Sequence, residues 1–186
     1  MNKKGKLFVI SGPSGVGKFT VISDFLKKHN DVKLSISTTT RSPRVGEING
    51  VHYHFVTKDE FKKLIEQNKF LEWADFNGNF YGTRLDLIED ILSNGQNLIL
   101  EIETVGAMQV KEKIPSATFI FIMPPSVDDL HKRLVNRGTE TEDVIQKRLA
   151  IAVGEIEKAK DFDFQIVNDK VENAVSQLEK IIVHKN

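Results

Sequence analysis

The chain of 186 residues is long enough for one domain with a buried core, and its 26 basic and 26 acidic side chains balance to a formal net charge of zero. The balanced charge argues against binding to nucleic acid or membranes through a global basic field, and the absence of cysteine excludes disulfides and thiolate metal sites. No stretch is long and apolar enough to span a bilayer, and the run LFVI near the N-terminus is too short for a signal peptide, so we expect a soluble, cytoplasmic protein.

Short apolar runs alternate with helical patterns along most of the chain. Branched and aromatic residues followed by polar or turn residues predict strands over 6–11, 96–102, 117–123 and 164–169. Apolar residues spaced three and four apart predict helices over 18–30, 84–95, 126–138 and 171–185. This alternation predicts an α/β fold with a parallel central sheet.

Two segments depart from this alternation. Residues 35–83 alternate aromatic and polar residues, with glycine turns expected at positions 46, 50, 78 and 82, which predicts a small, partly antiparallel inserted lobe. Within it, we expect Trp73 and Phe76 to pack in a core. Residues 137–160 are highly charged and helical in pattern, and predict a second mobile piece. The core of this single domain is therefore expected over about 1–34, 84–136 and 161–186.

The segment GPSGVGKFT follows the first predicted strand and opens a helix. It matches the spacing G-x-x-x-x-G-K of a phosphate-binding loop, in which backbone N–H groups and the helix N-terminus bind anions. Lys18 supplies a positive charge to the β- and γ-phosphates. The residues that we expect to bind ATP here are Gly12, Pro13, Ser14, Gly15, Val16, Gly17, Lys18, Phe19 and Thr20.

Phe19 stands where this motif has Ser or Thr, whose hydroxyl contacts magnesium. The next residue, Thr20, lies about 100° further round the helix, where its hydroxyl either caps the loop or reaches the metal through water. Because magnesium keeps several waters, we expect Thr20 with water to hold Mg²⁺ and nucleotide binding to persist. The ring of Phe19 lies beside the phosphates, in the core or against the inserted lobe, and the sequence leaves these alternatives open.

Arginines elsewhere suit a phosphate monoester, and acids at a strand end are expected to point at the same site. Arg41 and Arg44 lie beside hydroxyl residues, and guanidinium groups pair bidentately with phosphate. Glu101 and Glu103 end the strand predicted over 96–102, and ligands of open α/β sheets bind at the carboxyl ends of strands. His52 and His54 alternate on a predicted strand, but no third ligand accompanies them, so a metal pair is not favoured.

In combination, the motifs resemble the guanylate kinase family. The matching segments, in fixed order over about residues 6 to 183, are GPSGVGK, STTTRSPRVGE, EWADFNGNFYGT, LEIETVGA, PPS, RLVNRGTE, KRL and IVND. The resemblance implies a P-loop three-layer fold with a mixed α/β GMP-binding lobe at 35–83 and a helical lid at 137–160. It also implies transfer of the γ-phosphoryl group of MgATP to GMP, giving GDP and ADP, in purine nucleotide metabolism.

The resemblance also implies roles for individual residues. Around GMP it places Ser37, Arg41, Arg44, Glu47, Tyr53, Glu72, Tyr81, Gly82, Thr83, Glu101, Glu103 and Gly106. Glu72 and Glu103 are suitable readers of guanine, because its N1–H and 2-amino groups are donors that adenine lacks, while Ser37 or Thr83 can serve O6. On the ATP side it places Arg133, Arg137, Asn168 and Asp169. Lys18, Arg44, Arg137 and Arg148 form the implied catalytic set, because cations neutralise the transferring phosphate.

Two other functions remain as alternatives. One is a noncatalytic guanylate-kinase-like module that binds a protein partner, although such modules commonly have degraded phosphate loops and Lys18 is present here. The other is a related phosphotransferase with another acceptor, which the guanine-reading residues argue against. Two residues depart from the family pattern. Phe19 stands where relatives usually have Ser or Gly, and Val105 stands where they often have Gln. The sequence predicts neither the oligomeric state nor tolerance of dGMP.

Overall fold

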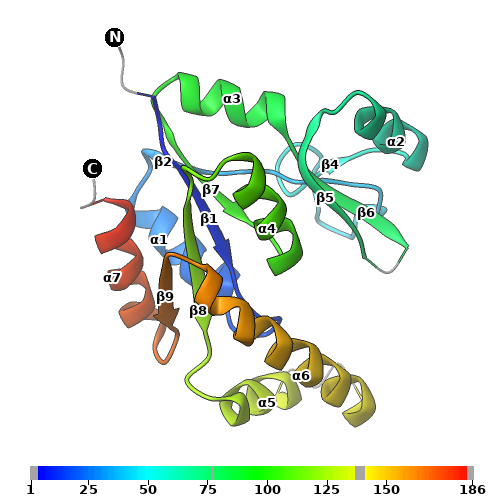
Figure 1. Cartoon of the computed structure of the whole chain (residues 1–186). Helices are drawn as coiled ribbons and strands as arrows, with labels where there is room; N and C mark the ends of the chain where they lie inside the picture. The colour runs from blue at the N-terminus through cyan, green and yellow to red at the C-terminus, as the bar shows by residue number, and fades with distance from the viewer. Residues whose placement is uncertain (1–3, 77, 137–140, 184–186) are drawn as a thin grey trace.

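A five-stranded parallel sheet forms the centre of the protein. The structure is a computed structural model that describes residues 4–76, 78–136 and 141–183 (Figure 1). The strands of the central sheet are β1 (Leu7–Ser11), β2 (Val32–Leu34), β7 (Asn97–Glu101), β8 (Thr118–Met123) and β9 (Phe164–Val167). Their order is β2-β7-β1-β8-β9, and every neighbouring pair is parallel. The predicted α/β class with a parallel central sheet is confirmed.

Helices cover both faces of this sheet and make a three-layer arrangement (Figure 1). They are α1 (Lys18–Lys28), α3 (Leu85–Ser93), α4 (Thr104–Lys113) and α7 (Val171–Ile182). Leu7 and Val9 of β1 pack into one cluster with α3 and α4, whereas Phe8 and Ile10 pack into a second cluster with α1 and α7. A strand that is buried on both faces is apolar at successive positions, which explains the continuous apolar runs in the sequence.

The elements that were not predicted from the sequence include β2, α4 and α2 (Lys58–Glu66). β2 has only three residues, too few to show a pattern. The buried residues of α4 are Thr104, Gly106, Ala107 and Val110, and such small or polar side chains make a weak apolar stripe. α2 does carry a local signal, because Thr57 and Glu60 form a capping box at its start.

A second sheet forms a separate small lobe. Its strands are β3 (Thr38–Thr39), β4 (His54–Phe55), β5 (Phe70–Phe76) and β6 (Asn79–Arg84), in the order β4-β3-β6-β5. β3 pairs parallel with β4, while β6 pairs antiparallel with β3 and β5, so the sheet is partly antiparallel as predicted. We call residues 38–84 the small lobe. In its core, Phe61 of α2 stacks on Phe70 of β5 with 4.3 Å between ring centroids.

Several expectations for the small lobe are wrong. Trp73 and Phe76 are 37% and 62% exposed instead of lying in a core, because the continuous burial of β5 ends before them and the hairpin extends into solvent. Gly82 belongs to β6 and not to a turn. His52 lies in a turn, where its Nδ1 accepts a backbone hydrogen bond, so it does not share a strand face with His54.

The remaining described helices follow β8. α5 (Val127–Asn136) and α6 (Glu142–Glu157) pack together through Leu130, Leu134 and Ile145, and a short 3-10 helix, η1 (Lys158–Asp161), leads to β9. Arg137, predicted to act from the lid, lies outside the described residues. Movement of core, small lobe and lid as separate bodies stays a prediction. Among the described residues, no helix combines the length and apolar character needed to cross a membrane.

Candidate active site

The phosphate loop, residues 12–17, joins the carboxyl end of β1 to the start of α1. Because β1 lies between β7 and β8, this loop is at the point in the sheet where ligands of open α/β folds bind. Gly12 and Gly17 have positive φ angles of 151° and 95°, and a Cβ on Gly12 would lie 2.4 Å from the Ile122 carbonyl oxygen. Glycine is therefore required for a backbone that directs N–H groups at an anion.

Lys18 provides the positive charge of the loop. Its Nζ donates to the Gly12 carbonyl oxygen at 2.5 Å, which folds the side chain back over the loop. Two half-buried carboxylates interact with this ammonium: Glu101 at the end of β7 and Glu155 on α6. Burial raises the pKa of both, the neighbouring Glu103 acts in the same direction, and Lys18 opposes the shift. Lys18 is therefore the cation of the loop, and burial disfavours the charged form of the two carboxylates that interact with it.

Glu155 was missed by the sequence analysis. Its carboxylate accepts hydrogen bonds from the backbone of Ser14 in the phosphate loop and from the hydroxyl of Thr104 in α4. Thr104 is itself buried, and its Oγ1 lies 3.4 Å from that of Ser11 at the end of β1. Glu155 thus joins α6 to the loop, a role that no local pattern in its charged segment indicates.

Two of the residues that were predicted to bind ATP donate hydrogen bonds to a backbone carbonyl oxygen of the phosphate loop. Arg133 of α5 donates from Nη1 to the Val16 carbonyl oxygen at 3.0 Å and from Nη2 to the Asn168 carbonyl oxygen at 2.8 Å. The buried Asn168 side chain donates to the same Val16 oxygen at 2.8 Å. Asp169 accepts from the Lys170 backbone at 2.6 Å, at the start of α7. Direct contacts of these residues with ATP stay predictions.

Phe19 and Thr20 begin α1 beside the loop. Phe19 is 69% exposed, so the orientations into the core or buried against the inserted lobe are wrong, and the ring lies on the solvent side of the loop. Thr20 is also exposed, which leaves its hydroxyl accessible to water or a ligand. Within the described ranges, no group of three or more His, Asp or Glu side chains is arranged to hold a metal ion.

Arg41 is the centre of a cluster on the small lobe. Its Nη1 and Nη2 donate to the two carboxylate oxygens of Glu47 at 3.0 and 2.8 Å, and Glu47 also accepts from the Arg44 backbone at 2.7 Å. These bonds lower the pKa of Glu47 to about 2, mainly through Arg41. The Arg41 guanidinium lies 5.4 Å from the centre of the Tyr53 ring, which is 6.2 Å from the Tyr81 ring. A fixed guanidinium beside two phenols suits a phosphate group.

The Tyr53 hydroxyl in this cluster stays a donor at neutral pH. Burial raises the pKa of Tyr53, the neighbouring Tyr81 adds to the shift, and Arg41 opposes it. Arg44 is exposed, with its guanidinium not enclosed by the lobe. The Arg41 cluster therefore has one guanidinium that is held by Glu47, that of Arg41, and one that is exposed, that of Arg44.

Glu72 forms a second, deeper group on the small lobe. It is 5% exposed, and Thr83 Oγ1 donates to its Oε1 at 2.5 Å. Burial raises the pKa of Glu72, while Thr83 and then Lys113 oppose the shift. Gly106 of α4 packs directly on this carboxylate, since a Cβ there would lie 2.6 Å from Oε2. Thr83 orients Glu72 in this structure. The hydrogen bond that was predicted from the Thr83 hydroxyl to guanine O6 would compete with this bond.

Three other residues that were predicted to bind GMP lie in different parts of the fold. Ser37 directly precedes β3, and its carbonyl oxygen accepts from the His54 backbone at 2.9 Å. Gly82 pairs with Trp73 of β5, next to Glu72. Glu103 interacts electrostatically with Glu101 and Glu155, the acids near Lys18, and its contact with guanine stays a prediction.

Comparisons with known proteins bear on this site. The family model described as Guanylate kinase matches residues 4–185. The chain is 48% identical over 182 residues to Guanylate kinase of Clostridium perfringens (strain SM101 / Type A), covering 98% of this chain and 84% of that protein. It is 47% identical over 180 residues to Guanylate kinase of Halalkalibacterium halodurans, covering 97% and 88%. The chain belongs to the guanylate kinase family.

A solved structure agrees with the family. The crystal structure of guanylate kinase from Anaplasma phagocytophilum matches with a TM-score of 0.79 and 31% identity, covering 98% of this chain and 87% of that one. The fold inferred from the family resemblance is thereby confirmed. The phosphate loop with Phe19 in place of Ser or Thr therefore lies in a chain of the guanylate kinase family.

The fold thus gathers most predicted residues of the guanylate kinase pattern into three groups. They are the phosphate loop with Lys18, the Arg41 cluster, and the buried pair of Glu72 and Thr83. Arg148 lies half-buried on α6, and its contact with a transferring phosphate stays a prediction. Besides Glu155, the sequence analysis missed Gln109 and Lys113, whose spacing on one helix face becomes visible only once α4 is known.

Proposed function

We propose that this chain transfers the γ-phosphoryl group of ATP to GMP, giving GDP and ADP. The observation that carries this proposal is that one chain has two groups of residues suited to bind phosphate. One is the phosphate loop with Lys18, and the other is the cluster of Arg41, Tyr53 and Tyr81. A phosphotransferase needs such a pair, one for the donor and one for the acceptor. Membership of the guanylate kinase family supports the proposal.

In this reaction an oxygen of the GMP phosphate attacks the γ-phosphorus of ATP. A new P–O bond forms, the bond to the bridging oxygen breaks, and ADP leaves with that electron pair. Phosphoryl transfer requires mainly positioning and neutralisation of charge. We assign Lys18 to the donor phosphates. Arg44, Arg137 and Arg148 are assigned to the transferring phosphate, which they reach as the lobe and lid close.

Magnesium accompanies ATP in this proposal. Oxygen atoms near the loop that could bind a metal ion include the exposed hydroxyl of Thr20 and the carboxylate of Glu101, which interacts with Lys18. Oxygen donors fit magnesium, which keeps several waters and takes few protein ligands. When bound, the ion neutralises charge on the β- and γ-phosphates. We assign Thr20, directly or through water, as the protein contact in place of the hydroxyl that Phe19 lacks.

We assign guanine recognition to Glu72. Its carboxylate is buried and held at one oxygen by Thr83. Guanine presents N1–H and a 2-amino group on one edge, and a carboxylate accepts from both. Adenine has neither donor, so the second oxygen of the buried carboxylate would stay unpaired, which is costly. The low exposure of Glu72 therefore supports a preference for GMP over AMP.

Formation of ADP that depends on GMP, in the presence of ATP and magnesium, tests the proposal. We expect GDP and ADP in equal amounts, and much slower reaction with AMP or a phosphorylated ribose as acceptor. No GDP at micromolar enzyme would refute the activity. Binding of GMP without binding of ATP would instead favour the noncatalytic module, against which the intact loop and Lys18 argue. The cytoplasmic location and the absence of nucleic-acid and membrane partners stay predictions.

A further inference from the structure

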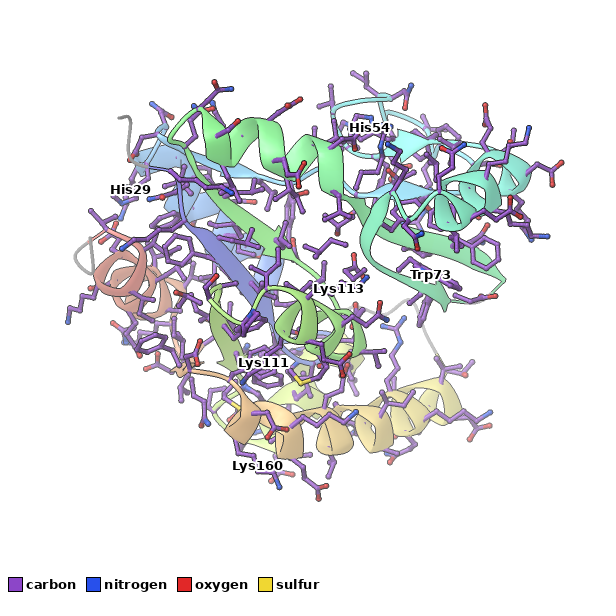
Figure 2. The ribbon with its side chains drawn as sticks, turned by 45° about the horizontal axis from the view of Figure 1, so that its top comes forward. His29, His54, Trp73, Lys111, Lys113 and Lys160 are labelled. Carbon is purple, nitrogen blue, oxygen red and sulfur yellow. The ribbon has the colours of Figure 1, made fainter. Side chains whose placement is uncertain are left out.

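The face of α4 that meets the small lobe carries Gly106, Gln109 and Lys113. These residues are three and four positions apart, so they lie along one side of the helix. Each of them lies against β5 at Glu72 or at a residue next to it in the strand. Figure 2 labels Lys113 and Trp73 at this junction between the central and the small sheet. The contacts differ in kind, and each bears on how Glu72 is held.

Gln109 pairs with the backbone of Trp73, the residue that follows Glu72. Its Oε1 accepts from the Trp73 N–H at 3.2 Å, and its Nε2 donates to the Trp73 carbonyl oxygen at 3.1 Å. β5 is the terminal strand in the order of the small sheet, so this side of its backbone faces α4 and not another described strand. The amide of Gln109 therefore extends the hydrogen bonding of the sheet by one residue and fixes the main chain next to Glu72.

Lys113 holds an irregularity in the same strand. The register of β5 against β6 shifts between Phe70 and Glu72, which makes Leu71 the extra residue of a β-bulge. All three residues are buried: Phe70 stacks on Phe61 of α2, Leu71 packs in the core cluster with α3 and α4, and Glu72 lies against Gly106. Lys113 Nζ donates to the Leu71 carbonyl oxygen at 2.6 Å and lies 3.4 Å from that of Phe70. Its ammonium thus holds the bulge that turns Glu72 inward.

Gly106 lets the helix approach. A Cβ at this position would lie 2.6 Å from Oε2 and 3.2 Å from Cδ of Glu72, closer than real Cβ contacts allow. On its other side, the carboxylate accepts from Thr83. Glu72 is therefore held between α4 and β6, and the position of α4 sets the position of its second oxygen.

We propose that Gln109 and Lys113 are positioning residues that hold the Glu72 carboxylate in register with guanine, and thereby set the preference for GMP over purine nucleotides without a 2-amino group. This inference rests on the proposed GMP kinase activity. Gln109 acts through the backbone of Trp73, and Lys113 acts through the carbonyls of the bulge. A shift of the carboxylate weakens the contact to the 2-amino group, because hydrogen bonds weaken steeply with distance and angle.

The charge of Lys113 has a second effect in the same direction. Burial raises the pKa of Glu72, and Lys113 is the cation that opposes this shift. An ionised carboxylate accepts from both guanine donors, whereas a protonated one presents a donor of its own. Lys113 therefore favours the form of Glu72 that binds guanine.

Steady-state kinetics with two acceptors test this positioning role. GMP and inosine monophosphate differ only in the 2-amino group, so the ratio of their kcat/KM values reports how well a carboxylate meets that group. For Gln109→Met, which keeps the volume but loses both hydrogen bonds, we expect kcat/KM for GMP to fall about tenfold, with a smaller fall for inosine monophosphate. The KM for ATP should stay within about twofold of wild type.

Matched variants separate positioning from general damage. Lys113→Met should lower the GMP to inosine monophosphate ratio in the same way, while Lys113→Arg, which keeps a cation with donors, should restore most of it. Glu112→Ala removes an exposed side chain of the same helix and should leave the ratio unchanged. Thermal melting of each variant checks that it is folded.

The outcomes are distinguishable from failure of the proposed function. If the wild-type protein does not phosphorylate GMP, the function itself is refuted. If the wild type is active and Gln109→Met and Lys113→Met keep the wild-type ratio, the positioning role is overturned. Equal losses for both acceptors and for ATP would also overturn it, because they indicate a structural role only. If Gln109→Met does not fold, the comparison of Lys113→Met with Lys113→Arg decides.

Discussion

Replacing Glu72 by Gln should separate guanine recognition from ATP use. The Glu72 carboxylate is 5% exposed, and Thr83 Oγ1 donates to its Oε1 at 2.5 Å. Glutamine keeps the shape of the side chain and one acceptor oxygen. Its amide nitrogen, however, is a donor, and it would face one of the two guanine donors. The substitution therefore replaces an attractive contact with a repulsive one without opening a cavity.

The expected magnitude follows from these contacts. A hydrogen bond to a charged group contributes about 1.5–3 kcal/mol. Loss of one such bond, and weakening of a second, predicts a fall in kcat/KM for GMP of about 10²–10³-fold. The KM for ATP should change by less than about twofold, because the phosphate loop lies on the central sheet and not on the small lobe.

We do not expect the stability of Glu72→Gln to fall with its activity. Burial raises the pKa of Glu72, so the folded protein holds a proton on this group more tightly than the unfolded chain does. Such a group stabilises the fold below its ordinary pKa, and this stabilisation is lost as the pH rises through the raised, folded-state pKa. At neutral pH the buried charge is unfavourable. We therefore expect the free energy of unfolding of Glu72→Gln to equal or exceed that of wild type.

A coupled assay of ADP formation, with GMP and ATP varied separately, measures the kinetic effect, and denaturant unfolding at neutral pH measures stability. Equal losses of kcat/KM for GMP and of ATP affinity would refute the assignment of Glu72 to guanine. A large loss of stability would refute the argument from burial, because it would show that the carboxylate stabilises the fold.

Three further predictions concern the phosphate sites. Lys18→Ala should lower kcat by about 10²–10³-fold, with little change in melting temperature, and an unchanged rate would contradict its contact with the donor phosphates. Phe19→Ser should lower the magnesium concentration that gives half-maximal activity; if the magnesium dependence stays flat, Thr20 or water already holds the ion. Glu47→Gln should raise the KM for GMP about tenfold, because Arg41 loses its bidentate partner, and an unchanged KM would argue against this cluster as the acceptor site. Because the pKa of Glu47 is lowered to about 2, its contribution to stability is present above its ordinary pKa and lost as the pH falls towards about 2. The difference in free energy of unfolding between wild type and Glu47→Gln should therefore become smaller as the pH falls.

Local features of this chain were predictable because their interactions are local. The phosphate loop is one continuous segment whose glycines and lysine serve the same anion, so spacing alone identifies it. Arg41 and Glu47 are six residues apart and pair within one loop, but this pair was not predicted, and Glu47 was placed near GMP only by the family resemblance. The apolar runs of β1 and β8 indicated a sheet buried on both faces before any contact was known.

No pattern along the sequence indicates the long-range contacts. Gln109 binds Trp73 across 36 residues, and Arg133 binds Val16 across 117. α4 itself was missed because its buried side chains are small, which is the property that lets it approach Glu72. The exposure of Phe19 could not be read from the sequence either, since a single aromatic residue at a helix start fits several environments.

The sequence by itself determined the class of fold, the phosphate loop and the family, since hydrophobic periodicity and motif order depend on residue types along the chain. Only the tertiary structure decided which acid is buried, which arginine supports the loop, and what holds Glu72 in place. The reason is physical: the pKa of Glu72 depends on desolvation and on Thr83 and Lys113, and these neighbours meet it only when α4 and β6 pack around β5.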